Sequence, residues 1–289
     1  MKQCVKHESG IAFLRELLAE GQSVFVFERL LERLRHWEYV LPLEEALLFL
    51  EEHLRDWKDE ERAEDLGEDS DYELWEEAVE EERIPEGFSL VRSLYISGHD
   101  IPDGLLPFII PHCAEVRKFK VFWHHFEESE WLLFADSPAL QNLESLEIDA
   151  NYEEPDTGAL RAILSSLYLK KLRSLRCQVS RDVEEKLLVL SNSPVMTQLE
   201  SLILHLEIDD EEVQVFERLL HSNSLKNLQH LGFTELNQTQ GLLLVKSPLL
   251  QTLQRLSIPD SFPEDEPDLY ANLVERAKSH SVALTLQKF

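Results

Sequence analysis

The sequence predicts an α/β solenoid, in which each repeated unit adds one parallel strand to a single sheet and one helix to its outer side. Three observations support this class. A twelve-residue pattern, seen best from Ser193 to Leu204, recurs at nearly constant intervals. Each copy has the alternating apolar residues of a strand, and the segments between copies have helical spacing. Intervals of roughly 25 to 30 residues are typical of solenoids.

Each copy is defined by an apolar anchor residue. A second apolar residue lies three positions before the anchor, and two more lie three and five positions after it. The alternation at these last two positions indicates a strand with one side buried. A degenerate eighth copy near Ser281 carries Leu284 and Leu286. The seven clear anchors are Val91, Val116, Leu143, Leu172, Leu199, Leu228 and Leu253, spaced by 25, 27, 29, 27, 29 and 25 residues.

The segments that follow the strands change to helical spacing, as at Leu160, Ile163, Leu164 and Leu167. Neither a strand nor a helix of this kind can bury its apolar side alone, so neighbouring units must stack with strands inside and helices outside. We therefore expect a repeat array from 88 to 289 with about eight parallel strands. We expect the final strand to present only a short, polar edge, which would discourage pairing with a neighbour.

The repeated strand sequences resemble the leucine-rich repeat family. The runs are Leu-Glu-Ser-Leu-Glu-Ile (143–148), Leu-Arg-Ser-Leu-Arg-Cys (172–177), Leu-Glu-Ser-Leu-Ile-Leu (199–204) and Leu-Gln-Arg-Leu-Ser-Ile (253–258). The period and the full helix are similar to the ribonuclease-inhibitor-like branch, over about 200 of the 289 residues. The family's turn-capping asparagine, eight residues after the anchor, is kept only as Asn151. The resemblance therefore implies the fold, with turns that vary between repeats.

The N-terminal part lies outside the repeat register. Residues 1–58 form a helical region with three short helices, the third opened by Pro42. The stretch from Leu41 to Leu50 also resembles the start of an F-box, a helical adaptor that often precedes leucine-rich repeats. Residues 59–87 are expected to form an acidic linker followed by a capping helix, because 56–86 holds 16 acidic residues against three basic ones. The N-terminal helices are thus either a cap or a docking module.

Composition narrows the class of partner. The formal net charge of −28 disfavours duplex nucleic acid and anionic membranes, since both would repel the chain. It favours a protein with a basic surface, unless the acidity serves only solubility. The chain opens without an apolar signal run, and its odd, scattered set of three cysteines fits a reducing compartment, so we expect a cytoplasmic protein. The sequence leaves the oligomeric state open.

No pattern in the sequence indicates an active site. Nine glycines leave little material for a phosphate-binding loop. His124 and His125 form the only adjacent histidine pair, but neighbours in sequence rarely bind one metal ion together. Cys113 and Cys177 fall on core positions of the register. We therefore expect a protein that is not an enzyme and that has no catalytic residues, cofactor or metal site.

The candidate partner-binding residues lie on two surfaces. The first is the open face, which is the concave side of the sheet turned away from the helices and is formed by residues two, four and six after each anchor. The second is the acidic rim, which collects acids from the turns that leave the strands. Acids also favour helix N-termini, so some of the rim serves capping. The open-face candidates are Tyr95, Lys118, Lys120, Phe122, Arg176, Ile203, His205, His230 and Arg255, and the rim candidates are Glu153, Glu154, Asp209, Asp210, Glu264 and Asp265.

These surfaces predict a protein-binding module that acts as an inhibitor, an immunity factor or an adaptor. In the alternative hypothesis, the chain is an adaptor or effector whose repeats target a substrate while the N-terminal helices recruit other machinery.

Overall fold

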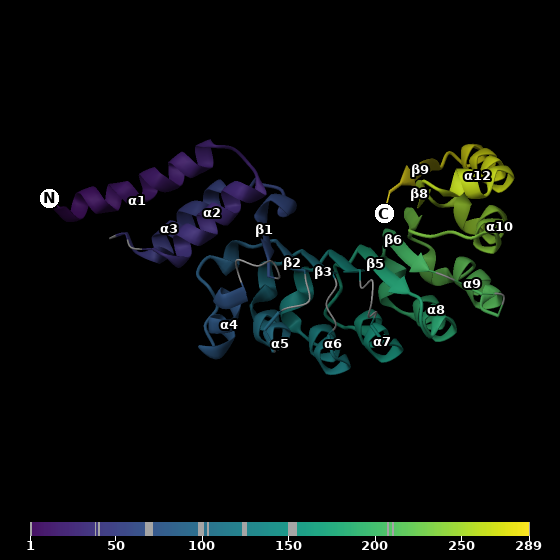
Figure 1. The fold of residues 1–289 in the computed structure, drawn as a ribbon, viewed down its shortest axis with the longest axis horizontal. Helices are drawn as coiled ribbons and strands as arrows, with labels where there is room; N and C mark the ends of the chain where they lie inside the picture. Colours follow the sequence, from purple (N-terminus) through teal and green to yellow (C-terminus); the bar gives the residue numbers. More distant parts are fainter. Residues whose placement is uncertain are drawn as a thin grey trace. The chain divides into compact units, whose positions relative to one another are not determined.

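A computed structural model describes residues 2–37, 39, 41–66, 72–97, 101–102, 104–122, 126–149, 155–206, 208–209 and 211–288. Within these residues, nine strands form one sheet in sequence order, and helices alternate with them along the chain (Figure 1). The predicted α/β solenoid is confirmed. The chain divides into two compact units, one of Met1–Lys120 with Pro138–Asn142 and one of Val121–Ser137 with Leu143–Phe289.

The first unit holds the N-terminal helices and the first strands. Its three predicted helices are present, and Pro42 precedes the third as expected. The second helix begins where the side chain of Ser23 accepts a hydrogen bond from the amide of Val26, which is an ordinary N-terminal cap. The elements are α1 (Lys2–Ala19), α2 (Val24–Arg35), α3 (Leu43–His53), β1 (Ala63–Asp65), α4 (Tyr72–Glu80), β2 (Ser93–Ser97), α5 (Leu105–Ile109) and the first residues of β3 (Lys118–Phe122).

The segment expected to be an acidic linker is partly folded, which corrects that expectation. Strand β1 pairs in parallel with β2, and Ala63 and Leu66 are buried. Glu64 is buried too, because its carboxylate pairs with Arg35 of α2. Self-repulsion of acids predicts a solvated chain only where the acids lack basic partners, and here the partners lie far away in sequence. The capping helix is present as α4, which buries Trp75 against Phe88.

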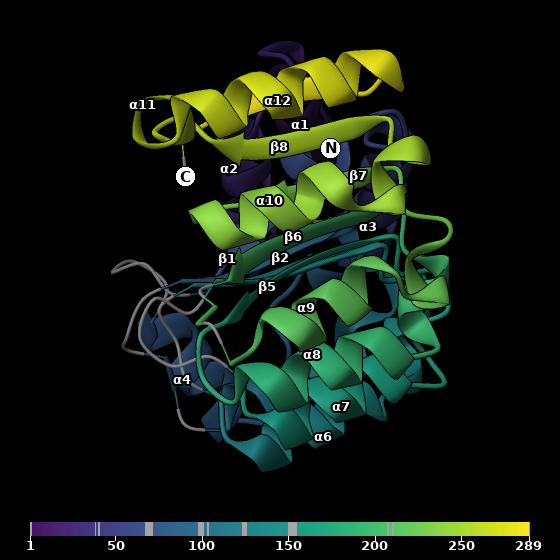
Figure 2. The ribbon, with the colours of Figure 1, turned by 90° about the vertical axis from the view of Figure 1, so that its right-hand side faces the viewer.

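The second unit carries the regular repeats. Its helices lie side by side along one face of its strands, as Figure 2 shows for α8, α9, α10 and α12. The elements are α6 (Glu128–Ala135), β4 (Ser145–Asp149), α7 (Thr157–Ser165), β5 (Ser174–Val179), α8 (Val183–Asn192), β6 (Ser201–Leu206), α9 (Val213–Leu220), β7 (His230–Phe233), α10 (Gln238–Lys246), β8 (Arg255–Pro259), α11 (Phe262–Asp265), α12 (Pro267–Ser279) and β9 (Ala283–Gln287).

The strand register follows the sequence pattern. Leu175, Leu202 and Leu231 are direct partners on three neighbouring strands, and all three are fully buried. Strands β5 and β6 alternate strictly between half-buried and buried residues. Each apolar side chain on the helix side therefore stacks on its equivalents in the adjacent repeats, which makes a continuous core.

A serine six residues before the anchor joins successive repeats. The hydroxyl of Ser193 donates a hydrogen bond to the carbonyl of Leu164 in the preceding repeat and accepts one from the amide of Val195. Because the same position recurs, a row of hydroxyls satisfies backbone groups at the ends of the outer helices. The other members are Ser166, Ser222 and Ser247, which donate to Ala135, Ser191 and Leu220 respectively.

The last strand departs from its expected character. Its five residues contain no charge and no proline, and Leu286 leaves 47% of its surface exposed. The edge is short, as predicted, and it carries the polar residues Thr285 and Gln287, but these are uncharged and an exposed leucine lies between them.

Candidate partner-binding surface

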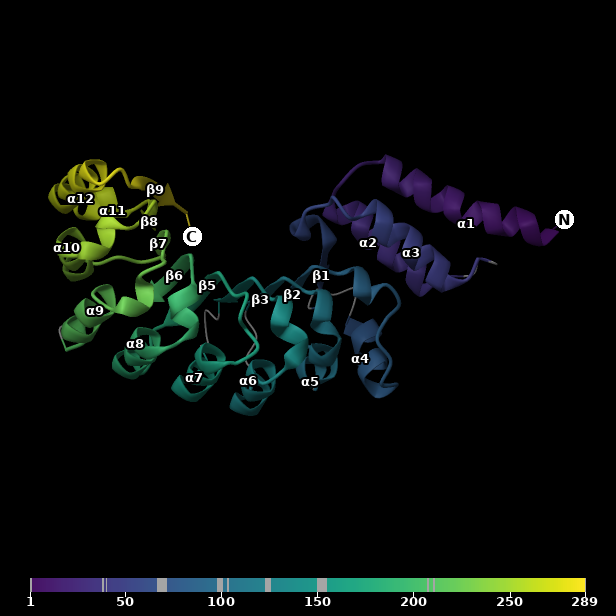
Figure 3. The ribbon, with the colours of Figure 1, turned by 180° about the vertical axis from the view of Figure 1, so that it is seen from behind.

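The open face of the second unit consists of every second residue of β4 to β8, together with Phe122 at the end of β3. The helices α7 to α12 cover the other side of these strands (Figure 3), so the open face is not covered by any helix of this unit among the described residues. On β5 and β6 its side chains are half-buried because they pack against one another across the strands. The candidates Arg176, Ile203, His205 and His230 lie here together, as the register predicts.

Arg176 has its charge balanced within the open face. Its guanidinium lies 3.0 Å from a carboxylate oxygen of Glu147, which is its direct partner on β4. Both side chains are largely shielded from solvent, so each holds the other in place. This pair presents a fixed dipole to a partner instead of a free positive charge.

His205 belongs to a polar cluster at the carboxyl end of the strands. Its Nδ1 atom lies 2.7 Å from the hydroxyl of Thr234, and its Nε2 atom lies 3.7 Å from the carboxylate of Glu235. The neighbouring side chain of Ile203 lies over Gly232, where an added Cβ would come within 3.1 Å of it. Because Gly232 has no side chain, Ile203 can pack directly against the backbone of β7.

His230 joins three strands. Its Nδ1 atom is 3.1 Å from Ser201 Oγ and its Nε2 atom is 2.8 Å from Ser257 Oγ, which in turn shares a 2.8 Å hydrogen bond with Thr285. The pKa of His230 is lowered from its ordinary value, first by burial and then by the charge of Arg255. A neutral ring fits the site, since one nitrogen can donate while the other accepts.

Arg255 and Phe122 complete the open-face candidates of this unit. Arg255 is exposed at the start of β8, and no carboxylate among the described residues forms an ion pair with it. Phe122 is half-buried at the end of β3. Arg255 is thus the cation of this face that a partner could meet directly.

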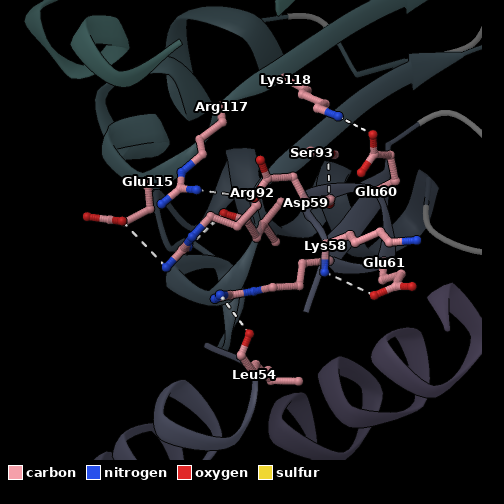
Figure 4. A network of polar contacts seen from close by, with 12 residues as sticks. Leu54, Lys58, Asp59, Glu60, Glu61, Arg92, Ser93, Glu115, Arg117 and Lys118 are labelled. Carbon is pink, nitrogen blue, oxygen red and sulfur yellow. Dashed lines mark hydrogen bonds and ion pairs between the residues drawn. The ribbon is translucent and has the colours of Figure 1, made fainter. Parts of the chain in front are cut away.

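In the first unit, the expected basic residues are already paired or stacked. Lys118 forms an ion pair with Glu60, and this contact lowers the pKa of that carboxyl (Figure 4). The Nζ atom of Lys120 lies 6.0 Å from the centre of the Tyr95 ring, close enough for a cation–π contact. The positive charge of Lys118 on this part of the face is therefore partly neutralised by Glu60.

A buried charge network, which the sequence pattern does not reveal, ties α3 to the first strands. Arg62 and Arg92 are only 3% and 5% exposed, and both donate to the carboxylate of Glu51, at 3.1 and 2.9 Å. Arg62 also donates to the carbonyl of Leu90 at 2.8 Å. Burial lowers the pKa of Arg62, and the charge of Arg92 adds to this effect. Figure 4 shows Arg92 reaching Glu115 as well, at 3.4 Å.

The described rim candidates are exposed, and several other acids of the turns cap helices. Asp209, Glu264 and Asp265 all lie at the surface. Asp156 accepts a 2.7 Å hydrogen bond from the amide of Ala159 at the start of α7, so this acid serves the helix. The candidates Glu153, Glu154 and Asp210 lie outside the described residues, as do His124, His125 and Asn151.

The described residues contain no group of three or more metal-binding side chains. Cys113 and Cys177 are buried, and burial raises the pKa of Cys113 to about 12. A thiol held in its neutral form this way is not an activated nucleophile. In the described part of the chain, no helix has the length and apolar character needed to cross a membrane.

The described part of the chain is an α/β repeat solenoid with one open sheet face. No protein-family model matches the sequence, and no curated protein matches it. Among solved structures, the chain is similar to a crystal structure of a Bacteroides fragilis protein from the Northeast Structural Genomics Consortium. The TM-score is 0.46 with 16% identity, covering 87% of this chain and 85% of that chain. A similarity at this level carries no argument about function.

Proposed function

We propose that the chain is a protein-binding module without enzymatic activity, built as a leucine-rich repeat array of the ribonuclease-inhibitor-like branch. It engages a protein partner through the open face, in the role of an inhibitor, an immunity factor or an adaptor. We further propose that it works in the cytoplasm and that its partner has a basic surface, in keeping with the net charge of −28.

The observation that supports this proposal best is the state of the open face in the second unit. Several of its side chains are half-buried and held by cross-strand contacts, as Arg176 is by Glu147 and His230 is by two serines. Ordering of side chains is a large cost of association, and side chains that are already fixed reduce this cost. A surface of this kind suits recognition of a folded protein.

Charge adds a second, kinetic role for the rim. Exposed acids such as Asp209, Glu264 and Asp265 attract a basic surface over a distance, which raises the rate of association more than it strengthens the complex. The open face contributes anchors such as Ile203 and the exposed cation Arg255. We expect the partner to be basic where it meets the rim and neutral or acidic where it meets Arg255.

The adaptor alternative has one specific observation in its favour. Phe25 of α2 and Leu48 of α3 leave 76% and 71% of their surfaces exposed. Large exposed apolar side chains on two helices of one unit can mark a second docking surface. The same helices also cap the first strands, through Arg35 with Glu64 and through Glu51, so both roles fit the geometry.

The proposal is tested by comparing two variants with the same chemical change. Ile203→Asp places a charge in the middle of the open face, and Leu167→Asp places one on a side chain that is 76% exposed after α7. Affinity capture from cells with mass spectrometry identifies proteins bound by the unmodified chain, and titration with each purified candidate measures its affinity. Circular dichroism first confirms that both variants fold.

We expect a genuine partner to lose at least about a hundredfold in affinity with Ile203→Asp and to bind Leu167→Asp normally. A Phe25→Asp, Leu48→Asp variant tests the adaptor alternative in the same assay. If every partner binds Ile203→Asp as well as the unmodified chain, the open face is not the binding surface.

A further inference from the structure

The open edge of β9 offers a second interaction surface, independent of the open face. Strand β9 pairs with β8 on one side, and no strand among the described residues pairs with its other side. At the opposite end of the sheet, α2 packs against β1, and Arg35 holds Glu64 there. Among the described residues, one end of the sheet is therefore covered, whereas the outer edge of β9 is paired with no strand.

The backbone of β9 shows which groups are unpaired. The amide of Ala283 donates to the carbonyl of Gln254 at 2.8 Å, and the carbonyl of Gln287 accepts from the amide of Asp260 at 3.0 Å. Because successive residues of a strand point their backbone groups in opposite directions, Ala283, Thr285 and Gln287 address β8. The N–H and C=O groups of the two leucines between them point outward, ready to bind another strand.

The side chains of β9 do not discourage such pairing. Natural edge strands usually carry charges, prolines or bulges that block a neighbour, and Ala283–Gln287 has neither a charge nor a proline. Leu286 lies on the same side of the sheet as the buried Ile258, its partner on β8, yet it is 47% exposed. A neighbouring strand would cover this leucine and also satisfy the free backbone groups.

We infer that the occupant is β9 of a second copy of this chain, paired antiparallel about a two-fold axis at Thr285. In this register, Leu284 and Leu286 of one copy exchange hydrogen bonds with Leu286 and Leu284 of the other. The two Thr285 residues then face each other as a non-hydrogen-bonded pair. Both leucines lie on the helix side, so the exposed Leu286 packs against the partner copy's Leu284.

Charge around the edge favours this antiparallel arrangement over a parallel one. The start of β9 lies near the exposed cations Arg255 and Lys278, with Glu275 as an exception. The other end lies near a larger group of acids, with Lys288 as the exception. Antiparallel pairing places the basic end of each copy against the acidic end of its partner, whereas parallel pairing would place like charges together. These acids are Asp260, Glu264, Asp265, Glu266 and Asp268.

A cysteine cross-link tests the register in the full chain, in a Cys4→Ser background, since Cys113 and Cys177 are buried. Residues facing each other across the two-fold axis lie roughly 4.5 Å apart between Cα atoms, which suits a disulfide. Thr285→Cys should therefore form a covalent dimer under mild oxidation. Ala283→Cys is the control on the same strand and the same face, because its copies would lie roughly 14 Å apart, four residues at about 3.4 Å each.

Light scattering provides the second measurement. We expect a concentration-dependent species of about 67 kDa, twice the mass of 33.7 kDa. Leu286→Lys should raise its dissociation constant at least about tenfold, because a charged side chain would replace the leucine that packs against Leu284 of the partner copy. Three outcomes each overturn the inference: a chain that stays monomeric without a Thr285→Cys cross-link, equal cross-linking by Ala283→Cys, or a dimer insensitive to Leu286→Lys.

Discussion

Replacing Leu202 by alanine should destabilise the second unit strongly. Leu202 is fully buried on β6 and is the direct strand partner of Leu175 and Leu231. The change removes three carbon atoms from the core, which costs about 2.4 kcal/mol at about 0.8 kcal/mol for each. A residual cavity of roughly 50 Å³ would add about 1.2 kcal/mol. We therefore expect a loss of about 3 to 4 kcal/mol in the free energy of unfolding.

The assay is denaturant unfolding followed by circular dichroism, with Gln229→Ala as the matched control. Gln229 lies immediately before β7 and its side chain is exposed, so its truncation should cost less than about 0.5 kcal/mol. Its backbone carbonyl, which accepts hydrogen bonds from Gln254 and Arg255, is unchanged by the substitution. If the two variants lose the same stability, the register that places Leu202 in the core is wrong.

Three further predictions follow from single features of the structure. Glu51→Ala removes the carboxylate that Arg62 and Arg92 share, and it should lower the free energy of unfolding by about 1 to 3 kcal/mol in a denaturant titration. The loss should be smaller than for a fully buried pair because Glu51 is half-exposed. The control Glu52→Ala, at an exposed neighbour, should change the stability very little, and equal losses for the two variants would refute the network. Because the pKa of His230 is lowered in the folded state, the stability that this residue contributes is complete above pH 6.5, the ordinary pKa of histidine, and is lost as the pH falls through the folded pKa. The His230→Gln variant should therefore lose less stability than the unmodified chain when the pH is lowered from about 7.5 to about 5.5. An equal loss in both proteins would contradict the lowered pKa. Cys113 has its pKa raised to about 12 by burial, so it should react with iodoacetamide only after the chain unfolds. Mass spectrometry of the labelled peptides can check this. Rapid labelling of the folded chain would contradict the prediction.

The sequence predicts the repeats well because one physical demand recurs in every repeat. Residues such as Leu175 and Leu202 must face the helices, and burial repeats at the same offset from each anchor. The serine row carries the same kind of signal, since Ser166, Ser193 and Ser222 stand six residues before successive anchors. Apolar periodicity alone does not reveal this row, because a serine hydroxyl is polar.

Contacts between residues far apart in the sequence explain where the structure differs from the sequence-based prediction. Lys118 pairs with Glu60, 58 residues away, and Arg35 pairs with Glu64. Neither pairing produces a periodic sequence pattern, so the acidic composition alone predicts a solvated linker after Asp59. Composition predicts such a segment correctly only when its charges have no partners elsewhere in the fold.

The central claim, that the open face of the sheet binds a protein, is tested most directly by the binding kinetics of one purified partner. The unmodified chain is compared with an open-face variant, Ile203→Ala with His205→Ala, and a rim variant, Asp209→Asn with Glu264→Gln and Asp265→Asn. We predict that the open-face variant dissociates at least about tenfold faster, while the rim variant associates more slowly with a weaker dependence on salt. Unchanged dissociation of the open-face variant would contradict the claim.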